Sequence, residues 1–277
     1  MNNIVEMFSY NFIVNAFIVG ILISICSSLI GITIVLKRNS MIGDGLSHVG
    51  FGAFAIATVL HFAPLEFALP IVMLASFLIL KLNENSKLHG DSAIALISSS
   101  SLAIGTFIIS ITKGVNTDIN NYLFGSILSI DNSDLLISVI LFIIVIIVYI
   151  ISYHKIFAIT FDEKFSKSIG INTEIYNIIF SCLCSVIVVI GMRIMGSLLI
   201  SSLIIFPKLT SMKIFKKFKT VVISSIIVSV IAFTSGLILS YILEAPTGAT
   251  IVIVNLIILI IFKLFSFIKN IKWIYKL

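Results

Sequence analysis

Long apolar stretches recur along the whole chain and are separated by short polar segments. Most of them approach the length of about 20 residues that an α-helix needs to cross a bilayer. Their apolar residues are continuous rather than alternating, so the pattern predicts helices and not the strands of a β-barrel. About nine membrane-spanning helices are predicted, and eight to ten are compatible with the pattern. Their approximate ranges are 11–36, 41–62, 65–82, 93–112, 135–153, 174–192, 194–210, 220–243 and 250–262.

The composition agrees with a chain that lies almost entirely in the membrane. Hydrophobic residues make up 59% of the 277 residues and charged residues only 11%, whereas soluble proteins carry about 25% charged residues. Almost nothing is left for a soluble domain. We therefore expect an all-α, polytopic membrane protein in which residues 1–277 form a single transmembrane domain.

The basic residues predict the orientation of the chain. With the N-terminus outside and the C-terminus inside, only Lys113 and Arg193 of the 18 lysines and arginines fall on the outer side. The inner set includes Lys208, close to the end of the seventh predicted span. Basic residues gather in the cytoplasmic loops of membrane proteins. This asymmetry explains the net charge of +6, so no nucleic-acid partner is expected.

The segment 41–58 differs in composition from the other apolar stretches. Four of the chain's 15 glycines lie between Gly43 and Gly52, and Asp44 and His48 interrupt the apolar residues. Residues four apart share one face of a helix, and a carboxylate in a membrane helix costs about 2.5 to 3.5 kcal/mol to insert. Asp and His together suit Zn²⁺ or Mn²⁺, while the absence of thiolates argues against Cu(I). The pair predicts a divalent-metal site.

Two questions about this pair stay open at the level of sequence. Asp44 can simply occupy the first turn of its helix, stabilised by the helix dipole, while His48 bonds to a neighbouring helix. A straight helix would also leave Asp44 near the inner interface, unless residues 39–45 are unwound and dip into the membrane. Two ligands are too few for a closed site, and a symmetric dimer would supply four.

Other polar residues suggest two further sites. His61 and Glu66 flank the turn at Pro64 and are candidates for an outer access point for the cation. In the most charged loop, an amphipathic spacing places Phe161, Phe165 and Ile169 on one face of a short helix that stops at Gly170. Such a helix would either dock into a partner protein or rest on the membrane.

Motifs for catalysis or nucleotide binding are missing from the sequence, including the phosphate-binding loop of ATPases. The chain is therefore expected to be a transport subunit rather than an enzyme. If transport uses ATP, another chain must hydrolyse it.

Three stretches in combination are specific for a known family: MIGDGLSHVGFGAFAIA, DEKFSKSIGINTEIYN and RIMGSLLISSLIIFPKLTS. With them, and with NNYLFGSIL and APTGATIVI, the chain resembles the permease subunits of bacterial ABC-type zinc and manganese uptake systems over nearly its whole length. One departure is the Lys-Leu-Thr-Ser that follows Pro207, where members of the family tend to have small residues.

The resemblance implies an importer of Zn²⁺ or Mn²⁺, with Fe²⁺ as a further candidate, in the bacterial cytoplasmic membrane. It implies a homodimer that receives metal from an extracytoplasmic binding protein and is driven by two cytoplasmic ATPase subunits. The metal is cargo, and no permanently bound cofactor is expected. Asp44 and His48 would coordinate the ion. The residues that would contact the ATPase are Asp162, Glu163, Phe165, Ile169 and Gly170.

Other transport classes remain as alternatives. A siderophore or cobalamin permease of the ABC type would have little use for a bare Asp/His pair, because its ligand arrives chelated. A gradient-driven secondary transporter would need several intramembrane ionisable groups or inverted repeats. A membrane-embedded metalloenzyme would need a third ligand and a general base. The sequence does not distinguish Zn²⁺ from Mn²⁺ or Fe²⁺.

Overall fold

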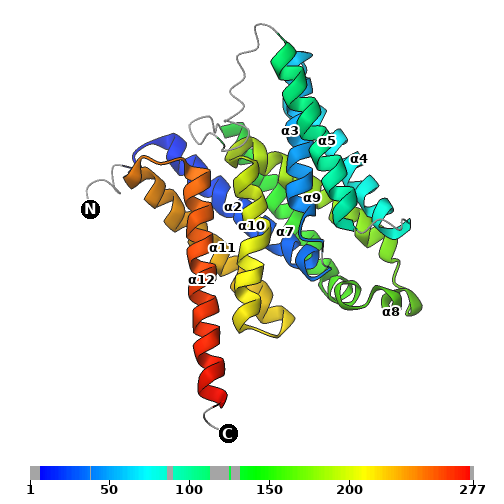
Figure 1. The fold of residues 1–277 in the computed structure, drawn as a ribbon, viewed down its shortest axis with the longest axis vertical. Helices are drawn as coiled ribbons and strands as arrows, with labels where there is room; N and C mark the ends of the chain where they lie inside the picture. Colours follow the sequence, from blue (N-terminus) through cyan, green and yellow to red (C-terminus); the bar gives the residue numbers. More distant parts are fainter. Residues whose placement is uncertain (1–6, 38, 86–89, 113–124, 126–131, 275–277) are drawn as a thin grey trace.

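The structure, a computed structural model, describes residues 7–37, 39–85, 90–112, 125 and 132–274. The described part is built from helices and contains no strand. Of the family-like stretch NNYLFGSIL, only Gly125 lies within the described residues. The helices are α2 (Asn11–Leu36), α3 (Ile42–Val59), α4 (Pro64–Asn85), α5 (Gly90–Ile111), α7 (Asn132–Phe161), α8 (Glu163–Ser168), α9 (Thr173–Met195), α10 (Ser197–Ile214), α11 (Phe218–Leu243) and α12 (Thr247–Ile274) (Figure 1).

Eight helices of the described part are long and apolar enough to cross a membrane. They coincide with eight of the predicted spans, so the all-α, polytopic fold is confirmed. The remaining predicted span, 65–82, corresponds to α4, whose apolar part, Pro64–Ile79, is shorter than the others. The chain is an integral, multi-pass membrane protein.

Five helices extend beyond their predicted ends: α4, α7, α9, α10 and α12. α7 has 30 residues, which corresponds to about 45 Å, longer than the hydrocarbon core of about 30 Å. Its end therefore projects from the membrane, and the short helix α8 follows outside the membrane-spanning segments. α9 continues through Arg193 to Met195 and ends at Gly196, whose φ of 86° breaks the helix before α10.

The helix α3 lies at the centre of the bundle and packs against α4, α5, α9 and α10 (Figure 1). Its glycines make this possible. A Cβ atom on Gly52 would lie 2.6 Å from the carbonyl oxygen of Ser101 in α5, and one on Gly105 would lie 2.9 Å from the Cα atom of Gly52. Small residues let membrane helices approach closely, so Gly52 and Gly105 fix the crossing of α3 and α5.

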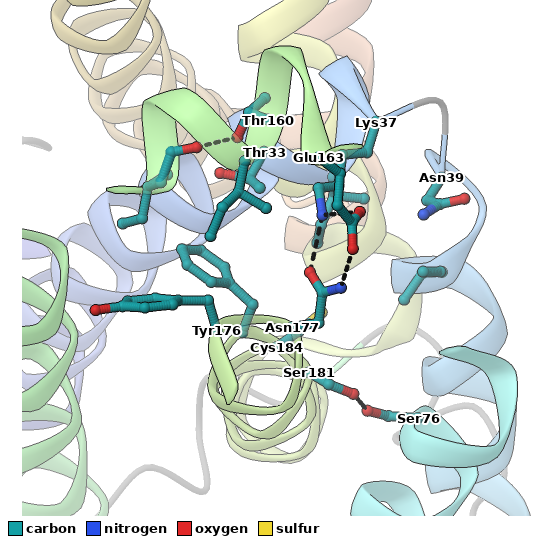
Figure 2. A pocket seen from close by; sticks show the side chains of 15 residues that line it. Thr33, Lys37, Asn39, Ser76, Thr160, Glu163, Tyr176, Asn177, Ser181 and Cys184 are labelled. Atoms are coloured by element: carbon teal, nitrogen blue, oxygen red, sulfur yellow. Dashed lines mark hydrogen bonds and ion pairs between the residues drawn. The ribbon is translucent and has the colours of Figure 1, made fainter. Parts of the chain in front are cut away.

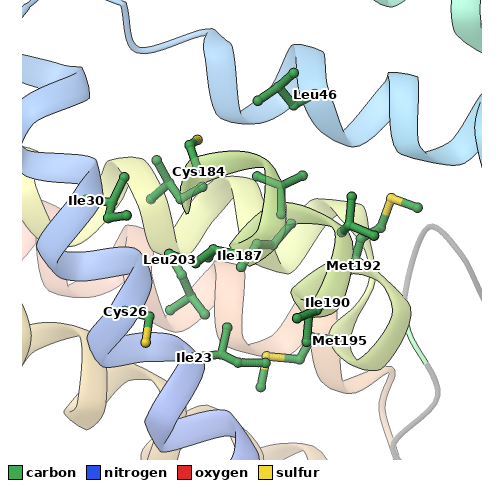
Figure 3. Packing of buried hydrophobic residues seen from close by; sticks show 14 of the residues in the cluster. Ile23, Cys26, Ile30, Leu46, Cys184, Ile187, Ile190, Met192, Met195 and Leu203 are labelled. Atoms are coloured by element: carbon green, nitrogen blue, oxygen red, sulfur yellow. The ribbon is translucent and has the colours of Figure 1, made fainter. Parts of the chain in front are cut away.

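A buried apolar cluster joins α2, α3, α9 and α10 (Figure 3). Ile23 and Ile30 of α2 lie near Ile187 of α9 and Leu203 of α10, and all four are almost completely buried. In contrast, α5, α7, α11 and α12 carry large apolar side chains on exposed faces. These faces suit contact with lipid, as expected for the outer helices of a membrane bundle.

Lys208 does not lie in a cytoplasmic loop, which corrects its place in the count of basic residues. It belongs to α10 and is completely buried. Its Nζ donates a hydrogen bond of 2.6 Å to the carbonyl oxygen of Leu203. That oxygen would normally accept from the amide four residues later, which is Pro207 and has no N–H. Gly31 of α2 makes room, because a Cβ there would lie 2.8 Å from Nζ.

Candidate metal site

The metal-site candidate Asp44 lies in the first turn of α3, which begins at Ile42. Of the two alternatives, the one with residues 39–45 unwound is not observed, because α3 begins at Ile42 and only residues 39–41 precede it. The amide of Gly45 already donates a backbone hydrogen bond to Met41. A carboxylate in a first turn is stabilised by the positive end of the helix dipole. The straight-helix alternative is the one that the structure shows.

Asp44 and His48 point toward one another along one face of α3. The Nε2 atom of His48 lies 3.6 Å from Oδ2 of Asp44. Two ligand atoms about 2.1 Å from one ion lie about 3.4 Å apart at a tetrahedral angle. The observed separation therefore fits a pair of ligands to one divalent cation without a change of backbone.

The two side chains differ in how far they are exposed. The side chain of Asp44 is 42% exposed and that of His48 is 27% exposed in the single chain. The Nδ1 atom of His48 is buried and has no hydrogen-bond partner, whereas Nε2 faces Asp44. The imidazole therefore presents Nε2 to any bound ion. A cation can reach the pair from the open side of α3.

Hydrogen bonds of Ser47 anchor the part of α3 that carries the pair. Ser47, fully buried, donates a hydrogen bond to the carbonyl oxygen of Gly43. Its hydroxyl also lies 3.4 Å from that of Ser201 in α10. These contacts join the start of α3 to α10 close to Asp44 and His48, because residues three apart on a helix are neighbours.

The pair is not a complete metal site within one chain. Among the described residues, no group of three or more His, Cys, Asp or Glu side chains could hold a metal ion together. Further ligands would have to come from water or from a second molecule. Two protein ligands that are half open to solvent suit an ion that must bind and leave again.

His61 and Glu66 are not brought together by the structure. Both are exposed, and they lie near the opposite end of α3 from Asp44, about 27 Å away for an 18-residue helix. Within the described part of the chain, the ion pairs do not include one between them. His61 has a φ of 57° in the turn before α4, and it stays a candidate for an outer access point.

A short helix, α8, is present in the predicted segment, but it is shorter than predicted, because Phe161 ends α7 and Ile169 already follows α8. The side chain of Asp162 accepts a hydrogen bond of 2.9 Å from the amide of Phe165 and caps the helix. Gly170 ends the segment with a φ of 85°. Phe165 is 58% exposed and Ile169 55% exposed. Large apolar side chains outside the membrane-spanning segments mark a surface that another protein can cover.

Glu163 of α8 points the other way, toward the helix bundle (Figure 2). Its carboxylate lies 3.2 Å from Nζ of Lys37, at the end of α2. Asn177 of α9 bridges the two: it accepts from Lys37 at 2.8 Å and donates to Glu163 at 2.9 Å. Partial burial raises the pKa of Glu163, but Lys37 and Asn177 outweigh it and hold the pKa below its usual value.

This three-residue network borders a cavity of about 420 Å³ between α2, α4, α7 and α9 (Figure 2). The lining is mixed, with hydroxyl and amide groups beside apolar side chains. The polar and charged lining residues are Thr33, Lys37, Asn39, Ser76, Thr160, Glu163, Tyr176, Asn177 and Ser181. The sequence does not predict this cavity, because its residues come from segments far apart in the chain.

A second ion pair was also missed. The Nη1 atom of Arg193 lies 3.3 Å from Oδ1 of Asp134, which is almost completely buried at the start of α7. The pair joins the first turn of α7 to the last turn of α9. Arg193 is predicted on the outer side, and the opposite charges of the two residues are the available signal.

With this geometry in hand, the chain can be compared with known proteins. The model of the ABC 3 transport family matches residues 9–266. The manganese import system permease protein ScaB of Streptococcus gordonii is 29% identical over 252 residues, covering 91% of this chain and 90% of that protein. A probable iron transport system membrane protein of Haemophilus influenzae is 29% identical over 270 residues, with 95% and 93% covered.

A solved structure shares the fold as well. The structure described as PsaBC from Streptococcus pneumoniae in complex with Fab superposes with a TM-score of 0.83 at 26% identity. The match covers 94% of this chain and 94% of the other. The likeness therefore extends over nearly all of both chains.

Proposed function

Because the chain belongs to the ABC 3 transport family, we propose that it is the membrane subunit of an ATP-driven importer that carries a divalent metal ion across the cytoplasmic membrane. The observation that carries the proposal is the pair of Asp44 and His48. Its two ligand atoms lie 3.6 Å apart on the open face of a central helix. The names of the relatives, a manganese import permease and a probable iron transport protein, support the same class of cargo.

The chemistry of the pair sets the class of ion. A carboxylate and an imidazole together bind Mn²⁺, Fe²⁺ and Zn²⁺. The described free cysteines are buried or partly buried in apolar helices, so no thiolate favours a soft ion. The relatives named for manganese transport make Mn²⁺ the first ion to test. No permanently bound cofactor is required, because the ion is the cargo.

A second copy of the chain would complete the site. Two ligands from each copy would give four, the number found in closed metal sites. In a symmetric dimer the same surface of each copy faces the other, so the open sides of both α3 helices would face one pathway. We therefore propose a homodimer with the pathway between the copies.

The ATPase would bind at α8. Phe165 and Ile169 form an exposed apolar surface there, and the cap by Asp162 and the stop at Gly170 give the segment a fixed shape. A cytoplasmic ATPase dimer would cover one α8 from each copy. An extracytoplasmic binding protein would deliver metal at the other end, near His61 and Glu66.

The test is transport by the reconstituted complex. The chain, its ATPase and its binding protein are placed in liposomes, and uptake of free Mn²⁺, Zn²⁺ and Fe²⁺ is compared with uptake of a ferric siderophore and of cobalamin. We expect uptake of a free divalent ion that requires ATP. Uptake of the chelates alone would support the siderophore or cobalamin class. Uptake driven by an ion gradient in the absence of the ATPase would support a secondary transporter.

A further inference from the structure

The network of Lys37, Glu163 and Asn177 connects the proposed ATPase contact to the proposed metal site. We propose that Lys37 and Glu163 are positioning residues that transmit movement of α8 to the start of α3, so that ATP hydrolysis is coupled to the release of metal. This inference rests on the proposed function. It assigns a role to an ion pair that neither binds the ion nor faces the ATPase.

The first argument is the origin of the three residues. Lys37 ends α2, Glu163 begins α8 and Asn177 lies in the early part of α9. Each of the three makes a direct contact to both others, with distances from 2.8 to 3.2 Å. Displacement of α8 therefore cannot leave the end of α2 in place without breaking charge-assisted hydrogen bonds.

The second argument is the partial burial of the ion pair between Lys37 and Glu163. An exposed ion pair contributes little, because water and salt screen it. Here the side chain of Lys37 is only 19% exposed and that of Glu163 is 34% exposed. The amide of Asn177 adds one hydrogen bond to each charge. Charge-assisted bonds of this kind are stronger than neutral ones, so the contact is suited to holding two elements together.

The third argument is the short path from Lys37 to the metal ligands. Asn39 donates a backbone hydrogen bond to Ile34 of α2, and Ile42 donates one to Asn39. α3 begins at Ile42 and carries Asp44 in its first turn. Asn39 is therefore held by backbone hydrogen bonds to α2 on one side and to the start of α3 on the other.

The cavity beside the network supplies the space for this movement. Asn39 and Ile42 line it together with Lys37 and Glu163 (Figure 2). A volume of about 420 Å³ at this point means that the start of α3 is not packed solidly against α9. Proteins move by switching between discrete packings, and such switching needs adjacent space.

Charge reversal provides a specific test. The variants are Lys37→Met, Glu163→Gln and the exchanged double variant Lys37→Glu with Glu163→Lys. In the exchanged variant the Asn177 carboxamide can rotate and again offer an acceptor to the lysine and a donor to the carboxylate. The matched control is Lys219→Met, which removes an exposed lysine at the start of α11.

Each variant is reconstituted with the ATPase and the binding protein, and both ATP hydrolysis and Mn²⁺ uptake are measured. We expect the ions transported per ATP to fall about fivefold in Lys37→Met and Glu163→Gln. ATP hydrolysis should change little. The exchanged variant should recover most of the ratio, and Lys219→Met should match the wild type.

Two results would overturn the inference. An unchanged ratio in both single variants would show that the network does not transmit movement. A loss of uptake and hydrolysis in parallel, with no recovery in the exchanged variant, would show that the network only supports the fold. If wild-type protein takes up no metal with ATP, the proposed function itself fails, and this is seen before any variant is made.

Discussion

Single residues of α8 have separate roles that their positions in the sequence did not reveal. Glu163 lies between Asp162 and Phe165, and the family resemblance implied that all three contact the ATPase. In the structure Asp162 caps the helix, Phe165 projects outward and Glu163 turns inward to Lys37. Only the outward residues are placed to touch a partner directly.

The inward position of Glu163 predicts a pH dependence of stability. Burial raises its pKa, but Lys37 and Asn177 outweigh burial and hold the pKa below its usual value. A carboxylate whose pKa is lowered by folding stabilises the fold above its unfolded pKa, and this contribution is lost as the pH falls through the lowered value. We expect Glu163→Gln to melt at a lower temperature than wild type at about pH 7, with the difference shrinking below about pH 4.3.

Melting in detergent across this pH range measures the difference. Glu174→Gln is the matched control, because Glu174 is an exposed acid in the first turn of α9 and should lose only the weaker stabilisation by the helix dipole. A difference for Glu163→Gln that stays constant across the range would contradict the role assigned to its charge.

At the scale of elements, the glycines of α3 differ in how closely the neighbouring helices approach them. A Cβ on Gly52 would meet the Ser101 carbonyl of α5 at 2.6 Å, and a backbone atom cannot easily move aside. A Cβ on Gly50 would lie 3.4 Å from the flexible side chain of Met192, which is ordinary van der Waals contact. The two positions are close in sequence but differ in the space around them.

Alanine substitution should separate these two glycines. We expect Gly52→Ala to lower the melting temperature by forcing α3 and α5 apart, at a cost of about 1 to 3 kcal/mol. Gly50→Ala should be neutral or slightly stabilising, because alanine favours the helix by up to about 1 kcal/mol. Equal melting temperatures for the two variants would contradict the close crossing at Gly52.

The exposed surface of α8 leads to a prediction about assembly. We expect Phe165→Ser to weaken binding of the ATPase by about tenfold or more, as for a central aromatic residue of an interface. The fold should be unaffected, because the side chain is already 58% exposed. Co-purification of the two subunits measures this effect.

The control for that experiment is Phe62→Ser. Phe62 is 56% exposed in the turn between α3 and α4, at the end of α3 far from Asp44. A cytoplasmic ATPase cannot reach it, so binding should stay at the wild-type level. Loss of the ATPase in both variants would mean that a general disturbance of the fold, not the α8 contact, weakens binding.

At the scale of the whole molecule, the membrane-spanning helices were predictable, because apolar stretches of about 20 residues are typical of helices that cross a bilayer. The position of Asp44 and His48 on one face followed from helical spacing alone. Lys208 was not predictable, because a lysine near the end of an apolar run ordinarily lies at the membrane surface. Its burial depends on Pro207 in its own helix and on Gly31 in another.

The contacts of Glu163 with Lys37 and Asn177 were likewise not predictable from the sequence. Lys37 and Glu163 are 126 residues apart in the chain, and no local pattern predicts that they meet. The depth of Asp44 was also ambiguous, because the flanking glycines suit an unwound segment as well as a helix. In the structure the segment is helical, and Gly43 packs against Ile204 of α10.

In the proposed function, the molecule as a whole contributes half of a metal site and one surface for an ATPase. The open side of Asp44 and His48 and the outward face of α8 both call for a partner. A dimer with the N-terminus of each copy outside would place both α8 helices on the cytoplasmic side, in agreement with the distribution of basic residues. The removal of Lys208 from the loop residues leaves that asymmetry intact.

The most direct measurement is ATP-dependent uptake of Mn²⁺ by proteoliposomes that contain the Asp44→Asn or His48→Gln variant with the ATPase and the binding protein. The controls are Asp91→Asn and His154→Gln, which change an exposed acid in the first turn of α5 and an exposed histidine of α7. We predict a loss of about a hundredfold or more for each site variant, with the ATPase still bound and both controls at the wild-type rate. Uptake within about twofold of wild type in both site variants, below the loss expected for even an outer-shell residue, would contradict a metal site at Asp44 and His48.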